Sequence, residues 1–146
     1  RYNVKGKTYF KYPNKYYYTD IGLRNARLNY RQYDPGQIME NIIYNELLRL
    51  GYSVDVGVVT DRTGGANMQK EIDFVVNDAD KKFYIQSAFQ MDTDKKESSE
   101  LASLILTKDF FKKIVVRMDI PHNFYDDNGI FHCNLTDLLL GRVELF

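Results

Sequence analysis

Two neighbouring stretches of sequence decide the fold: residues 71–77, EIDFVVN, and residues 83–89, FYIQSAF. Both are rich in β-branched and aromatic residues, which favour β-strands. Between them lies the tetrapeptide Asn-Asp-Ala-Asp at residues 77–80, whose small polar side chains are typical of a turn. The two stretches therefore predict a pair of adjacent strands joined by a short connection.

The flanking sequence extends this pair into an α/β domain. Asp34-Pro35-Gly36 opens a predicted helix that runs to about Leu50, and Gly51 ends it. The remaining patterns predict a strand at 52–60, a loop at 61–69, a helix at 94–107, a strand at 113–118, a hairpin into a strand at 130–133, and a helix at 136–140. This order favours a mixed central sheet flanked by helices.

Charge divides the chain into two parts. Residues 1–33 contain eight basic residues and one acid, Asp20, a net charge of +7, whereas residues 34–146 carry −7. Eight of the twelve tyrosines also fall within the first 33 positions. We therefore place a boundary between a basic, tyrosine-rich N-terminal segment, residues 1–33, and a domain at 34–146. The segment itself predicts a small hairpin near its start and a short helix capped by Asp20.

Composition limits the class of protein. The 146 residues are 44% hydrophobic and 27% charged, which excludes a disordered or collagen-like chain. No apolar run reaches the roughly 20 residues that span a membrane, so we expect no membrane partner. The single cysteine, Cys133, cannot form an internal disulfide, which favours a cytoplasmic location. Because the chain opens without methionine, we expect it to be part of a longer protein.

Most of the residue types that carry chemistry fit no template. His122, His132 and Cys133 have no metal-ligand spacing, and we assign them to packing and turns. Acidic side chains are more suggestive. Glu40 lies in the predicted 34–50 helix, Asp73 is central in one strand, and Gln86 follows on the next. Such a grouping can collect oxygen ligands for Mg²⁺, beside a lysine that orients water. Spacing alone also fits a structural role, with Glu40 solvated and Asp73 ending a strand face.

Four blocks of this sequence resemble a known family. They are residues 15–25 (KYYYTDIGLRN), 36–47 (GQIMENIIYNEL), 70–75 (KEIDFV) and 84–88 (YIQSA), in the family's order. The family is the C-terminal domain of unknown function that follows the ATPase domain in many bacterial and archaeal AAA-type ATP-binding proteins. It is placed in the PD-(D/E)XK nuclease-like superfamily. The resemblance therefore implies a restriction-endonuclease-like fold.

The resemblance also implies a site that has lost half of its residues. Glu40 falls on the family's helix acid and Asp73 on the PD aspartate, so these two would bind Mg²⁺, weakly if at all. Gln86 stands at the (D/E) position and Ala88 at the lysine position. We expect Glu40 and Asp73 to lie close together, with the pKa of at least one raised by repulsion. Lys70, Lys81 and Lys82 could in principle supply a displaced amine, but all three are predicted to lie at strand ends or in turns.

These residues lead to one main functional hypothesis and two alternatives. The main hypothesis is a noncatalytic accessory domain of an AAA-type ATPase, which recognises nucleic acid or protein or regulates the ATPase. ATP would then bind only in an N-terminal ATPase domain outside these 146 residues, which is also the expected partner. The alternatives are an active Mg²⁺-dependent nuclease using Glu40, Asp73 and a relocated lysine, and a purely structural assembly domain. The candidate nucleic-acid contacts are Lys7, Lys11, Lys15 and Arg24, with the tyrosines available for stacking or for packing.

Overall fold

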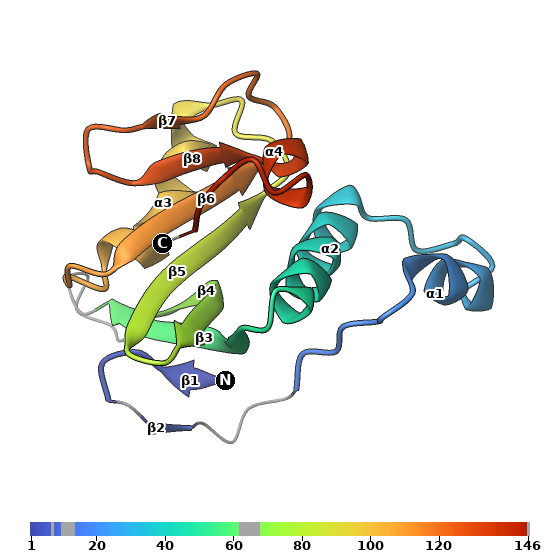
Figure 1. The fold of residues 1–146 in the computed structure, drawn as a ribbon, viewed down its shortest axis with the longest axis horizontal. Helices are drawn as coiled ribbons and strands as arrows, with labels where there is room; N and C mark the ends of the chain where they lie inside the picture. The colour runs from blue at the N-terminus through green and yellow to red at the C-terminus, as the bar shows by residue number, and fades with distance from the viewer. Residues whose placement is uncertain (7, 10–13, 62–67, 146) are drawn as a thin grey trace.

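The computed structural model describes residues 1–6, 8–9, 14–61 and 68–145. Within these residues the chain builds one mixed sheet in the order β2-β1-β3-β4-β5-β6-β8-β7 (Figure 1). Strands β3, β4 and β5 are antiparallel, whereas β5, β6 and β8 run parallel. The strands are β1 (Tyr2–Asn3), β2 (Thr8–Tyr9), β3 (Ser53–Asp61), β4 (Met68–Asp78), β5 (Lys81–Ala88), β6 (Lys112–Arg117), β7 (Phe124–Tyr125) and β8 (Phe131–Asn134). The predicted mixed α/β sheet is confirmed.

The helices are α1 (Ile21–Arg27), α2 (Pro35–Arg49), α3 (Asp94–Ile105) and α4 (Leu135–Leu139). A polar residue caps the start of each: the side chains of Asp20, Asp34, Thr93 and Asn134 accept hydrogen bonds from backbone N–H groups of the first turn. Gly51 follows α2 with a φ of 89°, the left-handed conformation that favours glycine at a helix end. The sequence-based expectations for these helices are confirmed.

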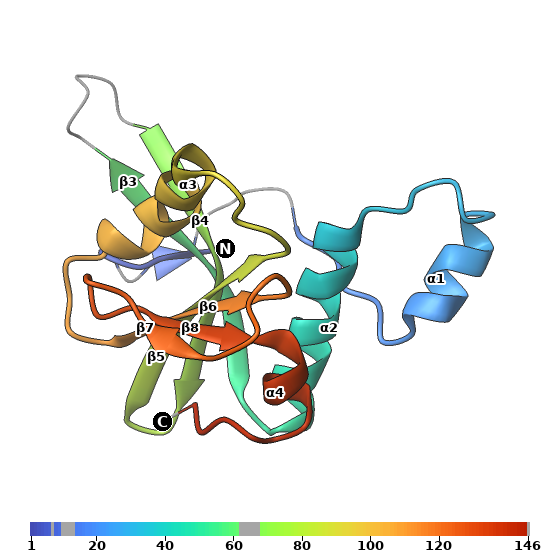
Figure 2. The same cartoon turned by 90° about the horizontal axis from the view of Figure 1, so that it is seen from above.

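Helices cover both faces of the sheet (Figure 2). On one face α2 and α4 bury a core that includes Ile43, Leu47, Phe74 and Ile85. On the other face α3 packs its Leu101 and Leu104 on a second core. The alternation of β4 and β5 supplies both cores, because successive side chains of a strand point to opposite faces. This is why consecutive residues of these strands, such as Phe74, Val75 and Val76, are all buried.

An irregularity in the β3–β4 pair lies next to Asp73. Asp55 pairs with Val75 but Gly57 pairs with Ile72, so the register shifts between these two positions. A Cβ atom at Gly57 would lie only 2.6 Å from the Cγ2 atom of Val75, which explains the glycine. Bulges of this kind redirect side chains and are common beside functional sites. Asp73 therefore sits where the regular ladder is interrupted.

The N-terminal segment is joined to the body of the protein. β1 pairs in parallel with β3, and Val4 N donates to the carbonyl of Val58, so the first residues extend the sheet. β4 begins at Met68, three residues earlier than predicted, because residues 68–70 continue the ladder with the end of β3. None of the helices in the described residues has the length and apolar character needed to cross a bilayer.

Candidate functional site

Glu40 and Asp73 share a single cation. Glu40 projects from α2 and Asp73 from β4, and both carboxylates approach the ammonium of Lys15. Lys15 Nζ lies 2.6 Å from Glu40 Oε1 and 3.6 Å from Asp73 Oδ1. The predicted proximity of the two acids is therefore confirmed. Their meeting point is the edge between α2 and the interrupted part of β4.

A third carboxylate completes the cluster. Glu71 lies two residues before Asp73 on β4, and its Oε1 atom is 2.7 Å from Lys15 Nζ. The other oxygen of Glu71 is 2.8 Å from Arg1 Nη2. One ammonium thus contacts three carboxylates, and a guanidinium assists at the outer one. We call Lys15, Glu40, Glu71 and Asp73 the Lys15 cluster.

Lys15 is held in place by the short stretch around it, residues 14–18, which we call the docked segment. The hydroxyl of Tyr17 donates to Glu40 Oε1 at 2.7 Å, and its ring stacks on Tyr44 of α2 with centroids 4.0 Å apart. The backbone of Tyr18 exchanges two hydrogen bonds with the Asn41 side chain, at 2.8 and 2.7 Å. These contacts fix the docked segment along α2.

Burial governs the protonation of Asp73. Its side chain is mostly enclosed, and Oδ2 accepts a hydrogen bond of 2.8 Å from the backbone N–H of Ser87. Desolvation, reinforced by the nearby charge of Glu40, raises the pKa of Asp73 to about 7. The direction agrees with the expectation, but the main cause is desolvation, and the repulsion between the two acids comes second. Near neutral pH this carboxyl therefore exchanges between its charged and neutral forms.

Lys15 and the neighbouring Tyr17 both have raised pKa values. Burial disfavours the charged form of Lys15, but its hydrogen bonds to Glu40 and Glu71 outweigh this and keep its pKa above the ordinary value. Burial, with Glu40 beside the hydroxyl, raises the pKa of Tyr17 far above the usual range. Lys15 therefore stays an ammonium and Tyr17 a neutral donor at any physiological pH.

Gln86 and Ala88 supply no charge to this edge. The Gln86 side chain lies beside Asp73, where Oε1 accepts from Asp73 N and from Ser103 Oγ, both at 3.4 Å. Its Nε2 atom faces Glu100 Oε2 at 3.5 Å. Ala88 is buried in the core beneath α3. The carbonyl oxygen of Gln86 is thus already used by the protein, and Ala88 provides only packing.

The amine at the cluster comes from Lys15, which was not among the lysines considered from the sequence as sources of a displaced amine, Lys70, Lys81 and Lys82. Lys82 lies instead over the ring of Phe111, 5.5 Å from its centroid. Lys15 is separated from Glu40 by 25 positions, and its pairing depends on the path of the chain over α2. In the sequence Lys15 opens the block of residues 15–25 that carries the family resemblance, and we predicted it to contact nucleic acid.

Of the remaining candidate contacts, Arg24 is the one within the described residues. Arg24 belongs to α1, where its Nη1 atom donates to Asn25 Oδ1 and to the carbonyl of Gln32. Lys7 and Lys11 lie outside the described residues. In residues 1–6, 8–9, 14–61 and 68–145, no group of three His, Cys, Asp or Glu side chains is arranged to hold a metal ion. In its present geometry the Lys15 cluster is closed by its own ammonium.

A second ionic cluster, which sequence analysis missed, joins the far strands of the sheet. Arg117 at the end of β6 forms two hydrogen bonds of 2.8 Å with the carboxylate of Asp119. Its Nη1 atom also lies 3.3 Å from His132 Nδ1, and His132 Nε2 lies 3.5 Å from Asp126 Oδ2. His132 is fully buried and stacks on Phe124, and its desolvation lowers its pKa. We call Arg117, Asp119, His132 and Asp126 the Arg117 cluster. The burial and stacking of His132 fit the packing role that we expected for it.

Comparison with known proteins gives one relative of undetermined role. An uncharacterized protein of Haemophilus influenzae is 37% identical over 116 residues, which cover 80% of this chain. The matched region is 26% of that protein, so the chain spans about a quarter of the length of the relative. No family model matches the sequence, and no solved structure matches it. The similarity indicates that related sequence occurs as a region of a larger protein.

Proposed function

We propose that this chain is a noncatalytic recognition or regulatory domain with a restriction-endonuclease-like fold, built around a nuclease-like centre that has decayed. The observation that carries the proposal is the position of the Lys15 ammonium among the carboxylates of Glu40 and Asp73. Gln86 and Ala88, which stand where the resemblance expects an acid and a lysine, add to it. The charge that would bind a metal ion is neutralised by the protein itself.

Electrostatics explains why such a centre binds Mg²⁺ poorly. Mg²⁺ requires near-octahedral oxygen ligands and is held mainly by the charge of carboxylates. Here an incoming ion must displace Lys15 from two hydrogen bonds with carboxylates, at 2.6 and 2.7 Å. It would also face a neutral amide at Gln86. Without a metal ion, the attacking water and the leaving phosphate oxygen lack their main stabilisation.

Calorimetry and a cleavage assay test this proposal. Titration of the protein with millimolar Mg²⁺ or Mn²⁺ should give no saturable binding, and labelled single- and double-stranded DNA should stay intact. Gln86→Glu combined with Lys15→Met, which adds a carboxylate and removes the ammonium, should gain metal binding. The exposed Lys96 provides the matched control, since Lys96→Met should leave the wild-type result unchanged. Tight binding or cleavage by the unmodified chain would defeat the proposal.

A second candidate is an active Mg²⁺-dependent nuclease, which the placement of Lys15 favours. In this alternative Lys15 is the relocated lysine, and it orients water beside a metal held by Glu40 and Asp73. The two candidates make opposite predictions for one variant. Lys15→Met should abolish cleavage if the site is active, whereas the decayed site has no cleavage to lose and should gain affinity for Mg²⁺.

The wider role of the domain rests on the resemblance to C-terminal domains of AAA-type ATPases. We propose that the parent protein is a cytoplasmic ATPase and that ATP binds outside the described residues. Deletion of this domain from the parent should change the rate of ATP hydrolysis or its response to nucleic acid, as measured by phosphate release. An unchanged rate in both conditions would contradict a regulatory role.

A further inference from the structure

A cavity of about 540 Å³ opens beside the Lys15 cluster, between the docked segment, α1 and α2. Its lining includes Asn14, Lys15, Tyr16, Tyr18, Arg24 and Gln37. Most of these side chains come from the basic N-terminal segment, and the Lys15 cluster does not use Tyr16, Tyr18 or Arg24 in any hydrogen bond from a side chain. The cavity therefore has its own set of polar and aromatic groups.

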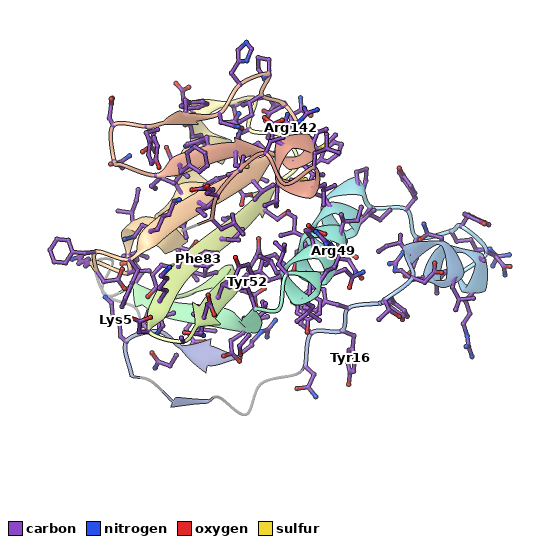
Figure 3. The ribbon with its side chains drawn as sticks, viewed as in Figure 1. Lys5, Tyr16, Arg49, Tyr52, Phe83 and Arg142 are labelled. Atoms are coloured by element: carbon purple, nitrogen blue, oxygen red, sulfur yellow. The ribbon has the colours of Figure 1, made fainter. Side chains whose placement is uncertain are left out.

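The tyrosines of the docked segment divide between two sides. Exposure alternates along residues 14–18, so that Lys15 and Tyr17 turn toward the body while Tyr16 and Tyr18 turn away from it. Tyr16 is 79% exposed and Tyr18 is 48% exposed. Figure 3 shows Tyr16 pointing away from the rest of the molecule. Two aromatic rings with accessible faces thus border the cavity.

Arg24 places a positive charge next to these rings. Its guanidinium carbon lies 5.9 Å from the centroid of the Tyr18 ring. The hydrogen bonds of its side chain within the described residues use Nη1, which leaves Nε and Nη2 to bind a ligand. A guanidinium with free donors is suited to a phosphate group. The acid that lines the cavity, Glu40, is already bonded to Lys15 and Tyr17.

We infer that this cavity binds single-stranded nucleic acid, with a base stacked on Tyr16 or Tyr18 and a phosphate held by Arg24. The inference rests on the proposed recognition function and names its partner. Exposed aromatic rings beside a cationic groove are the usual means of holding single strands, because every unpaired base offers a flat face. The net charge of −7 over residues 34–146 disfavours binding of the same ligand elsewhere on the body.

Fluorescence anisotropy of a labelled oligothymidylate of about 12 nucleotides tests the inference. The wild-type chain should bind it with an affinity that falls as salt rises. Tyr16→Ala and Tyr18→Ala should each weaken binding about tenfold through lost stacking. Arg24→Gln should weaken it and reduce the slope of affinity against salt by about 1. Because Tyr16 is so exposed, its substitution leaves the fold intact and keeps the test valid if another variant unfolds.

The chain offers matched controls outside the cavity. Tyr125 of β7 is 63% exposed, and the Arg142 side chain is 65% exposed beyond α4, away from Tyr16 in Figure 3. Tyr125→Ala and Arg142→Gln should bind the oligonucleotide like the wild type. Equal losses in cavity and control variants would overturn the inference, because they would indicate contacts spread over the surface.

Binding measurements with other nucleic acids distinguish the possible ligands. A duplex of the same length should bind more weakly than the single strand, since its bases are already stacked; equal affinity would overturn the stacking arrangement. Thymidine monophosphate should compete only at high concentration, because it offers one phosphate. No binding by any oligonucleotide would also overturn the inference, while leaving a noncatalytic domain with a protein partner. Cleavage of the bound strand in Mg²⁺ would instead defeat the noncatalytic proposal and leave the cavity assignment standing.

Discussion

The Lys15 cluster and the Arg117 cluster balance their charges from different parts of the chain. In the Arg117 cluster the cation ends β6, and its partners Asp119 and His132 lie 2 and 15 positions away. In the Lys15 cluster the acids belong to α2 and β4, but the ammonium belongs to the docked segment 14–18. The cation of the Arg117 cluster therefore belongs to the sheet, whereas the cation of the Lys15 cluster comes from a segment outside it.

This difference determines how each cluster can change. In the Arg117 cluster the contact between Arg117 and His132 depends on the pairing of β6 with β8, and Asp119 follows Arg117 by two positions. In the Lys15 cluster the cation depends on the docked segment, which belongs to none of the strands. A cation on a separate segment, such as Lys15, is therefore suited to a site that binds and releases a ligand. A cation within the sheet, such as Arg117, is suited to stabilising the fold.

The largest expected effect is on the Arg117 cluster. Arg117→Met replaces a side chain that is 9% exposed and leaves the carboxylate of Asp119 without its bidentate partner. Breaking a pair of this kind costs about 3 kcal/mol of the free energy of unfolding. Urea denaturation near neutral pH measures the loss. The exposed Arg142, changed to Met, is the control and should cost less than about 1 kcal/mol. Equal costs would show that both arginines are surface groups.

The stability lost in Arg117→Met should also depend on pH. The Arg117 guanidinium and its hydrogen bonds lower the pKa of Asp119 to about 2. An acid with a lowered pKa stabilises the folded state above its unfolded pKa, and this stability is lost as the pH falls through the folded value. The difference between wild type and Arg117→Met should therefore shrink below about pH 4.

A smaller loss in the free energy of unfolding is expected when the ammonium of Lys15 is removed. Lys15→Met leaves three carboxylates in mutual repulsion, and lost charged hydrogen bonds of this kind cost about 1.5–3 kcal/mol, less here because the Lys15 side chain is 25% exposed. Mg²⁺ should then restore stability, because an ion that binds only the folded state shifts the unfolding equilibrium. Thermal unfolding with and without Mg²⁺ measures the recovery.

The two clusters should respond differently to the ion. Arg117→Met should show no recovery of stability in Mg²⁺, because Arg117 contacts one carboxylate, that of Asp119, and its other side-chain neighbour is His132. Recovery of both variants, or equal stabilisation of the wild-type chain, would mean that the ion acts on general charge and not on the Lys15 cluster.

Much of the fold could be predicted from the sequence, but the site could be predicted only in part. α2, β4 and β5 follow from local patterns: capping by Asp34, apolar periodicity and β-branched runs. The partnership of Glu40 and Asp73 came from the resemblance, since neither spacing nor composition brings a helix residue to a strand. The ion pairs of Lys15 and Arg117 were missed because a long side chain finds its partners only after the chain has packed. Nothing local to Arg117 distinguishes it from a solvated strand end.

The effect of Asp73→Asn should vary with pH, because the substitution removes a carboxyl whose pKa differs between the folded and unfolded states. In the folded chain the pKa of Asp73 is about 7, raised by desolvation and by Glu40, whereas unfolding returns it to its ordinary value near 4. Between these two values the folded state holds a proton that the unfolded state has lost, so this carboxyl makes the protein less stable as the pH rises from about 4 to about 7. Asparagine carries no such cost and still presents an oxygen to Ser87 N.

The variant should therefore gain stability relative to wild type between about pH 5 and about pH 8, as shown by the difference between the two melting temperatures. Glu100→Gln provides a control, because Glu100 faces Gln86 from α3 and takes no part in the Lys15 cluster. The melting-temperature difference between that control and the wild type should show no comparable rise over the same range. If the Asp73→Asn difference stays constant or falls as the pH rises, Asp73 is fully ionised at pH 5, and the Lys15 ammonium then balances its charge as completely as Arg117 balances Asp119.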